Sequence, residues 1–245
     1  MRMAWSMGYR MVFASPREAL ALMGRLHDAG AMADARELLA ALSAVAPADA
    51  VAWLESQRAR IAAGDMRALF LAISQAGRKV GRTSVANPVG WTSDQVARVL
   101  LVLALPSEPA VAWLETLERI FHAGTVDELV ALYQALPLYS HPQRLVARAA
   151  EGVRSNMRPV FEAVALNNPF PAAHLDDAAW NQMVLKCFFL AADVDRVIGI
   201  DQRRNSDLGR MLADYARERR VASRSVDKRL PPLARACGAE CLDSP

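Results

Sequence analysis

Apolar residues recur at intervals of three and four along most of the chain, a spacing that places them on one face of an α-helix. Between Pro47 and Gly64, for example, Val51, Leu54 and Ile61 follow this pattern. Alternating apolar and polar positions never continue long enough for a sheet, so we expect an all-α fold. The predicted helices cover residues 15–27, 34–42, 47–63, 66–75, 92–105, 108–122, 125–135, 142–155, 157–167, 176–191 and 205–221.

Local signals mark the ends of several predicted helices. Thr92 and Gln95 have the spacing of a capping box, and Pro106 would end the helix that they start. Turn-forming residues gather between the helices. Loops are therefore expected at residues 77–90, 137–142, 167–171 and 193–201.

A six-residue segment occurs twice, which indicates that helix pairs repeat. The sequence AVAWLE occupies residues 50–55 and again residues 110–115, and a glycine follows each copy at the same distance. Each copy predicts a helix, a glycine turn and a second helix, which is the unit that α-solenoids stack. We therefore predict stacked helical hairpins in a short α-solenoid, a HEAT-like superhelix. A chance similarity between two alanine-rich helices is the alternative.

Length and composition are typical of one globular domain. The chain has 245 residues, of which 53% are hydrophobic and 22% are charged. We expect a flexible N-terminal segment over residues 1–14, a single helical-hairpin domain over 15–221, and a partly ordered or flexible tail over 222–245. The longest apolar run, Val99–Leu105, is far below the roughly 20 residues of a membrane span. Three cysteines are too few for a disulfide framework, so a cytoplasmic location is favoured.

The motifs of common enzyme classes are missing from the sequence. No GxSxG elbow, dinucleotide-binding glycine motif or P-loop occurs. His27, His122, His141 and His174 lie in separate segments, and the cysteines in the CxxxC spacing near the C-terminus have no nearby histidine. We therefore expect no catalytic residues, no metal site and no cofactor.

The segment 154–190 carries polar side chains within a largely apolar sequence. Its last helix is apolar on nearly all sides and should be buried, yet it contains Lys186. A buried lysine needs an acidic partner, and Glu162 is the nearest candidate. The polar candidates are Arg154, Asn156, Glu162, Asn181, Gln182 and Lys186, and the candidate apolar wall consists of Phe170, Trp180 and Phe188. These residues form either a structural network or a pocket for a small organic molecule.

Two basic clusters are candidates for binding anions. Arg78, Lys79 and Arg82 lie in the predicted loop 77–90, where they could hold a phosphate or a carboxylate. Over residues 203–235, ten basic side chains outnumber four acidic ones, although the whole chain has a net charge of only +3. Both clusters fit either a solvated surface or contact with anionic lipid or an acidic partner. Nucleic acid is a poor candidate, because no aromatic residues interleave with the basic ones.

The central tract resembles the signature of the EboA family of bacterial proteins. It reads RSNMxxVFEAVAxxNPxP followed by DxAAWNQMVLK, and the similarity covers about residues 47–221. The positions that carry the resemblance include Trp91, Asp94, Gln95, Arg98, Arg154, Ser155, Asn156, Met157, Phe161, Glu162, Asn168, Pro169, Pro171, Trp180, Asn181, Gln182, Met183 and Lys186. The loop before Trp91 is shorter than in the family pattern, and both ends of the chain match poorly.

The resemblance implies a role in metabolite traffic. Family members belong to a gene cluster linked to moving a secondary-metabolite precursor toward the periplasm, and no reaction is established for them. It implies a non-catalytic helical binding or scaffold component whose partners are other proteins of the cluster, with a small organic metabolite as the ligand of the pocket. The alternative is an enzyme or accessory subunit that uses Glu162 and Lys186 as an acid/base pair. A further alternative is a peripheral adaptor on the inner membrane, held to anionic lipid by the basic clusters.

Overall fold

The structure, a computed structural model, describes residues 35–88 and 90–239. Within these ranges the chain is helical apart from its connections, and the β-type pairing is one isolated bridge between Ser84 and Thr92. Residues 35–43 are helical. The elements that follow are α2 (Ala48–Ala62), α3 (Met66–Val80), α4 (Ser93–Leu103), α5 (Ala110–Ala123), α6 (Val126–Gln134), η1 (Leu136–Leu138), η2 (Pro142–Leu145), α7 (Val146–Arg154), α8 (Arg158–Ala165), α9 (Phe170–His174), α10 (Asp177–Phe189), η3 (Val194–Arg196), α11 (Ser206–Val221) and α12 (Leu230–Ala236).

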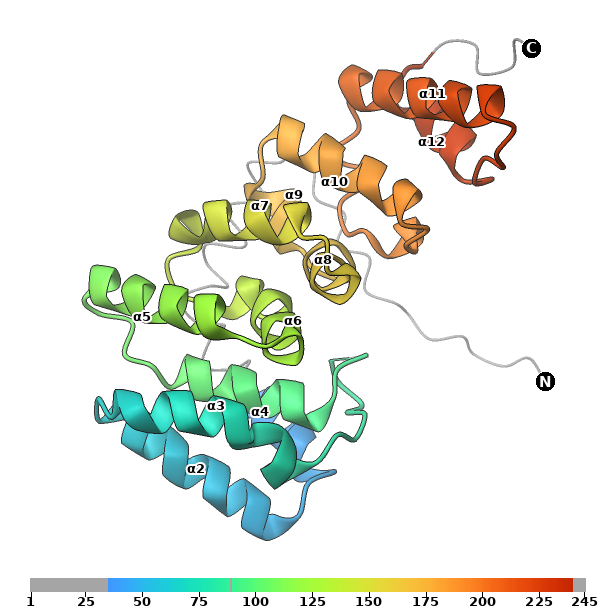
Figure 1. The fold of residues 1–245 in the computed structure, drawn as a ribbon. Helices are drawn as coiled ribbons and strands as arrows, with labels where there is room; N and C mark the ends of the chain where they lie inside the picture. The colour runs from blue at the N-terminus through green and yellow to red at the C-terminus, as the bar shows by residue number, and fades with distance from the viewer. Residues whose placement is uncertain (1–34, 89, 240–245) are drawn as a thin grey trace, which may run out of the picture.

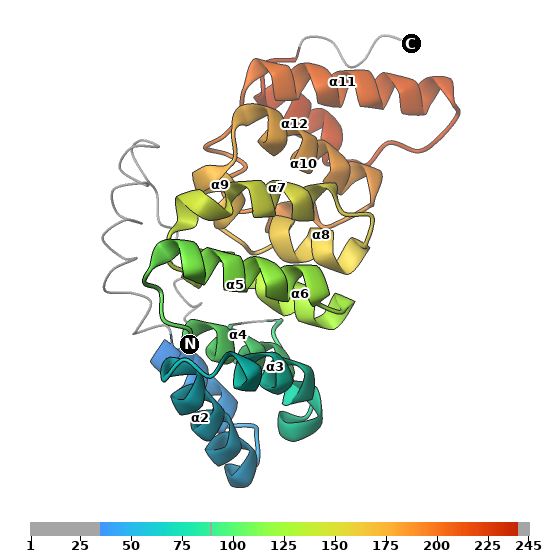
Figure 2. The ribbon, with the colours of Figure 1, turned by 60° about the vertical axis from the view of Figure 1, so that its left-hand side comes forward.

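The helices form a stack in which each layer packs on the next, as Figures 1 and 2 show from two sides. At one end α2, α3 and α4 pack together, α4 contacts α6, and α6 contacts α8. α7 lies against α8, α10 contacts both, and α11 with α12 closes the other end. Because each layer buries its apolar face against its neighbour, the prediction of an all-α fold of stacked helical hairpins is confirmed.

Helix starts are fixed by caps that the sequence already contains. The backbone N–H of Thr92 donates to Oε1 of Gln95 at 2.9 Å, and that of Thr125 donates to Oε2 of Glu128 at 2.8 Å. Both pairs are capping boxes, so the signal read at Thr92 is confirmed. Asp176 caps α10 by accepting a backbone N–H at 2.7 Å.

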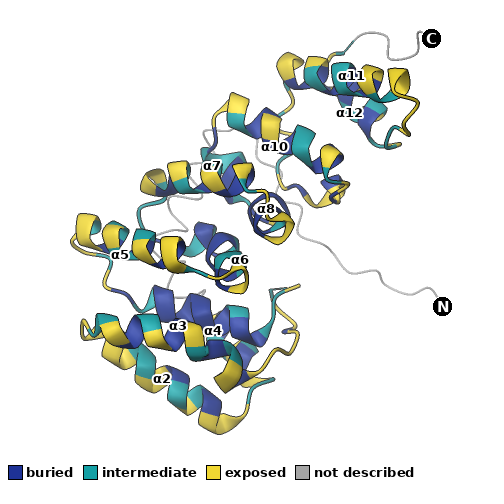
Figure 3. Cartoon of the chain, viewed as in Figure 1, coloured by how far each residue is buried: buried dark blue, intermediate teal, exposed yellow. Residues whose placement is uncertain are grey.

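One continuous hydrophobic core runs through the described stack, from Leu38 near its start to Cys237 in the final turn. Figure 3 shows buried positions on the helix sides that face neighbouring helices and exposed positions on the outer sides. The largest fully buried side chains include Trp180, Phe161 and Phe170, all from the central tract. This tract therefore packs at the centre of the fold.

The two copies of AVAWLE form α2 and α5 but bury different side chains. In α2, Leu54 is buried and Trp53 is half-buried, whereas in α5, Trp113 is buried and Leu114 is half-buried. Each copy forms a helix before a glycine turn, as predicted. The two helices are nevertheless rotated differently about their axes, because each packs against different neighbours.

Several connections are more helical than the sequence predicts. α3 extends to Val80, so Arg78 and Lys79 belong to its last turn and not to a loop. The short helix α9 begins inside the predicted loop 167–171 and ends at His174, and η3 forms within the predicted loop 193–201. One or two turns of helix carry too little periodicity to be read from sequence.

The C-terminal part of the chain adds a helix that the sequence does not predict. α12 packs along α11, with Leu230 and Ala234 buried. Gly209 permits this close approach, since a Cβ there would lie 2.8 Å from the carbonyl oxygen of Cys237. Ordered helix therefore continues beyond residue 221, where the sequence suggests a partly ordered or flexible tail.

Some sequence predictions fall outside the described residues. These are the N-terminal segment 1–14, the first helix at 15–27 with His27, and Cys241. Among the helices that the structure does describe, none has the length and apolar character needed to cross a membrane.

Candidate functional site

Lys186 is held by backbone carbonyls and not by a carboxylate. Its Nζ donates to the carbonyl oxygens of Val153 at 2.7 Å and Ser155 at 2.8 Å, and it lies 5.0 Å from the centre of the Phe161 ring. These carbonyls lie at the end of α7, where the last C=O groups lack partners within the helix. Lys186 thus caps α7 from the neighbouring helix α10. Desolvation lowers the pKa of Lys186.

The predicted pairing of Glu162 with Lys186 is wrong. Glu162 instead accepts a hydrogen bond from Nε of Arg158, four residues earlier in α8, at 2.8 Å. Lys186 needs no acidic partner, because two charge-assisted hydrogen bonds to carbonyl oxygens satisfy the ammonium group of a lysine that is only partly buried. The enzyme alternative therefore loses its acid/base pair, since neither group contacts the other.

The other polar candidates do not form one network. Asn181 is buried in α10 and exchanges two hydrogen bonds with Asn205, 3.0 and 2.9 Å long, while Asn205 caps α11. Gln182 is exposed, as are Arg154 and Asn156 at the turn between α7 and α8. Asn181 therefore connects α10 to the start of α11, and the remaining three side chains face solvent.

The candidate apolar wall is part of the packed core. Phe170, Trp180 and Phe188 are 1%, 0% and 7% exposed. Arg203 lies 5.1 Å from the Trp180 ring and donates to carbonyl oxygens around α9. One side of α10 does reach solvent, because Phe189 is 70% exposed, so the prediction of a helix buried nearly all round is wrong there.

Many of the basic residues in the two clusters have acidic partners. Arg82 pairs with Asp127 at 2.8 Å, whereas Arg78 and Lys79 are exposed on α3. In the C-terminal cluster the arginines with aspartate partners are Arg203, Arg204, Arg210, Arg217 and Arg229. Much of the local excess of positive charge is therefore matched within the chain, which weakens the attraction to lipid or to an acidic partner.

Among the described residues, no three His, Cys, Asp or Glu side chains lie close enough together to hold a metal ion. Cys187 and Cys237 are buried free thiols, and burial raises the pKa of Cys187 to about 12. His141 faces the carbonyl oxygen of Ser107 at 3.0 Å.

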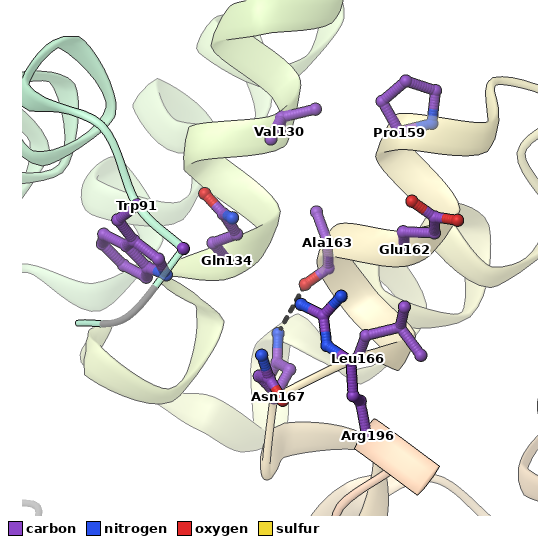
Figure 4. Close-up of a pocket in the computed structure, with 11 residues that line it drawn as sticks. Trp91, Val130, Gln134, Pro159, Glu162, Ala163, Leu166, Asn167 and Arg196 are labelled. Atoms are coloured by element: carbon purple, nitrogen blue, oxygen red, sulfur yellow. Dashed lines mark hydrogen bonds between the residues drawn. The ribbon is translucent and has the colours of Figure 1, made fainter. Parts of the chain in front are cut away.

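Two adjoining cavities form a groove beside α6 and α8, which we call the α6–α8 groove. The first cavity has a volume of about 190 Å³ and the second about 300 Å³. Both are lined by Trp91, Gln134 and Asn167, so they share one wall. In the first cavity, Trp91 and Gln134 lie on the side opposite Glu162 and Arg196, as Figure 4 shows.

A tight turn after α8 shapes one end of the groove. Asn167 has a left-handed backbone with φ 53°, and its N–H donates to the carbonyl oxygen of Arg196 at 2.8 Å. Asparagine tolerates this conformation better than most residues, because its short side chain bonds locally. With its amide oxygen turned toward the guanidinium, Asn167 also accepts from Nη2 of Arg196 at 2.9 Å and from Nε at 3.3 Å. The turn therefore fixes the position of the arginine.

Asn168, the next residue, joins three helices. Its Nδ2 donates to the carbonyl oxygens of Tyr133 and Ala163, both at 3.0 Å, and its Oδ1 accepts from the backbone N–H of Phe170 at 3.0 Å. The side chain is buried, and its amide hydrogen bonds connect α6, α8 and the start of α9. This amide gives the groove a rigid base.

Gln134 carries a buried, unpaired acceptor next to the groove. It is the last residue of α6 and lines both cavities. Its Oε1 is shielded from solvent, and no group in the described part of the chain donates to it. A buried acceptor without a donor costs about 1–3 kcal/mol, so a rotation of this side chain that exposed Oε1 to a bound N–H or O–H would recover that energy.

Sequence reasoning missed most of this groove. Trp91 and Asn168 enter only through the EboA resemblance. Glu162 enters through the same resemblance and as a partner for Lys186, whereas Gln134 and Arg196 carry no sequence signal of their own. They come together because the connections before α4, after α8 and after α10 meet at the end of α6.

Comparison with known proteins agrees with the resemblance of the central tract. No curated protein and no solved structure matches the chain. The model of a family described as "Metabolite traffic protein EboA" matches residues 35–234. This match covers most of the chain and includes every residue that lines the groove. The chain therefore belongs to the EboA family.

Proposed function

We propose that this EboA protein is a non-catalytic binding component that holds a small organic metabolite in the α6–α8 groove. Membership in the family supports a general role in metabolite traffic. The groove supports the finer proposal, because two adjoining cavities of about 190 and 300 Å³ share a wall made by Trp91, Gln134 and Asn167. Concave sites with a few converging polar groups are typical of small-molecule binding.

The groups in the groove favour binding over chemistry. Glu162 is paired with Arg158, and Arg196 is bound by Asn167. Neither charged group hydrogen bonds to a hydroxyl, a thiol or an imidazole that it could activate. An activated side-chain nucleophile needs such a contact with a neighbouring base.

The proposal extends to the wider pathway. The stacked helices would act as a scaffold for other proteins of the same gene cluster, and the cargo would be a secondary-metabolite precursor bound for the periplasm. Stacked helical pairs support a scaffold role, because they present a long continuous surface on which partners can bind.

Retention of a metabolite by the protein tests the binding role. Protein purified from its native host under mild conditions would be denatured, and the released small molecules and co-purified proteins identified by mass spectrometry. Val130 lines the first cavity, so Val130→Trp should fill it and abolish retention. Val111 is an exposed valine on α5 outside the groove, and Val111→Trp should retain the metabolite at the parent level.

Thermal unfolding would show whether both variants fold like the parent. Loss of the metabolite in Val130→Trp alone supports the proposal. Equal retention in both variants, or no retained small molecule in the parent, would show that the groove is not a metabolite site. Recovery of partner proteins without any small molecule would leave only the scaffold role.

A further inference from the structure

Arg196 reaches the groove from η3, the short turn that follows α10. Its exposed side chain extends past Leu166 toward α8, and its guanidinium faces the first cavity, as Figure 4 shows. With its amide oxygen turned toward the guanidinium, Asn167 holds one side of this group by accepting hydrogen bonds from Nε and Nη2. A guanidinium has a second edge, made by Nη1 and Nη2, and Asn167 does not occupy it.

The acids nearest to Arg196 in the chain are already engaged. Asp193 and Asp195 flank it in the same turn, but both pair with Arg229, at 2.7 and 3.4 Å. Glu162, on the same side of the first cavity as Arg196, pairs with Arg158. Within the described residues, no carboxylate lies within ion-pair distance of Arg196. The guanidinium therefore brings an uncompensated positive charge to the groove.

The other end of the groove has a different character. Trp91 is half-buried and lines both cavities, and the second cavity adds Pro88, Pro137 and Leu138. An exposed acid, Glu37, also lines the second cavity. A negative group would be repelled from this end and attracted to the Arg196 end, while a flat apolar body could pack along Trp91.

We propose that the α6–α8 groove takes an organic anion, with its oxyanion on the open edge of Arg196 and its apolar body against Trp91. The oxyanion is a carboxylate or a phosphate ester, because both match the paired N–H groups of a guanidinium. This inference rests on the proposed function, since it names the class of metabolite that the groove would hold.

The test compares three probes that share one flat body: 2-naphthoate, 2-naphthyl phosphate and the neutral 2-naphthamide. Each is titrated into the ¹⁵N-labelled full chain, and the indole N–H signal of Trp91, assigned with Trp91→Phe, reports binding at the groove. We expect at least one anion to bind roughly tenfold more tightly than the amide, the equivalent of about 1.4 kcal/mol. The tighter of the two anions assigns the oxyanion, and either order supports the proposal.

Three variants test whether Arg196 causes the preference for anions over the amide. Arg196→Gln should weaken binding of the anion roughly tenfold and leave the amide unchanged, since it removes one paired set of charge-assisted hydrogen bonds. Arg196→Lys should recover part of the loss through its charge. Arg224→Gln, at an exposed arginine outside the groove, should leave binding of all three probes unchanged. Thermal unfolding and the backbone spectrum confirm that each variant is folded.

Three results would overturn the anion proposal. The first is equal or tighter binding of the amide, and the second is a preference for the anion that survives Arg196→Gln. The third is the absence of any change at Trp91 with all three probes. The Val130→Trp retention experiment tests the proposed function separately. If the retained metabolite is neutral, the proposed binding function stands and the anion proposal fails.

Discussion

Lys186 stabilises two helices through one side chain. Its ammonium group satisfies carbonyls at the end of α7, while its own helix, α10, packs against α7 and α8. A carboxylate at this place would have balanced the charge but left the terminal carbonyls without donors. The residue is thus a helix cap supplied from another helix, which explains why the central tract needs a lysine among apolar side chains.

Substitutions at Lys186 and Glu162 distinguish a helix cap made by Lys186 from an ion pair between the two residues. Lys186→Met should lower the free energy of unfolding by about 2 kcal/mol, because two carbonyls lose charged donors. Glu162→Gln should cost about 0.3–0.5 kcal/mol, the value of an exposed pair four residues apart on a helix. Urea denaturation of the single and double variants measures both effects, and they should add within about 0.5 kcal/mol.

Gln182→Met is a matched control, since Gln182 is exposed one turn before Lys186 on the same helix. It should leave the free energy of unfolding nearly unchanged. A coupling energy above about 1 kcal/mol between positions 162 and 186 would instead show that the two charges interact in solution.

At the scale of whole elements, the middle of the stack depends on a close helix contact. Gly152 lies in α7, and a Cβ there would come within 2.6 Å of the Tyr133 ring and 2.7 Å of the Val164 side chain. Alanine forms helices better than glycine by about 1 kcal/mol. Glycine at this position therefore reflects packing of α7 against its neighbours and not a preference of the helix itself.

Two helical glycines should respond to alanine with opposite signs. Gly152→Ala should lower the free energy of unfolding by about 1–3 kcal/mol, because the added methyl group overpacks the contact. At Gly77, in α3, a Cβ would lie 3.4 Å from its nearest neighbour, the Arg98 side chain, which is an ordinary contact. Gly77→Ala should therefore raise stability by up to about 1 kcal/mol through helix propensity. Chemical denaturation compares the two, and a gain in stability for Gly152→Ala would contradict the close packing.

Element ends were predictable where the signal is local. Thr92 with Gln95 marks the start of α4 because a capping box involves only four consecutive residues. The short helices α9 and η3 depend instead on distant contacts, such as the amide of Asn168 that binds the start of α9 while it bonds to α6. Local periodicity carries no information about such contacts.

For the molecule as a whole, the apolar faces at the two ends of the helix stack have to be covered. α12 covers α11 at the C-terminal end, and its neighbour Arg229 binds Asp193 and Asp195 in the turn that carries Arg196. The last helix is therefore connected to the groove through charges as well as to α11 through apolar contacts. Stacked-helix proteins generally need such terminal elements to shield the apolar face of the last repeat.

Removing residues 223–245 should destabilise the protein, although the sequence suggests a partly ordered or flexible tail there. Burial of one leucine contributes about 1.5–3 kcal/mol, and 1 kcal/mol shifts the melting temperature of a protein of this size by about 2–4 °C. We expect the melting temperature to fall by roughly 5 °C or more, because the buried side chains of Leu230 and Ala234 and the packing of α12 on α11 are lost. Removal of residues 240–245 alone is the control and should have little effect. Identical thermal unfolding of the two truncations would contradict a structural role for α12.

Fold class, most helix positions, the helix-pair repeat and the family can all be read from the amino-acid sequence. These properties follow from helical periodicity, from caps made by neighbouring residues and from one long continuous motif, all of which are local in the chain. Which polar groups meet is a property of the folded molecule alone. Lys186 reaches carbonyls 31 and 33 residues away, and the groove joins Trp91, Gln134, Asn167 and Arg196 from four separate segments. Such meetings depend on how helices pack in three dimensions, because a charged side chain can be satisfied by an acid, a carbonyl or solvent, and the position of its neighbours selects among them.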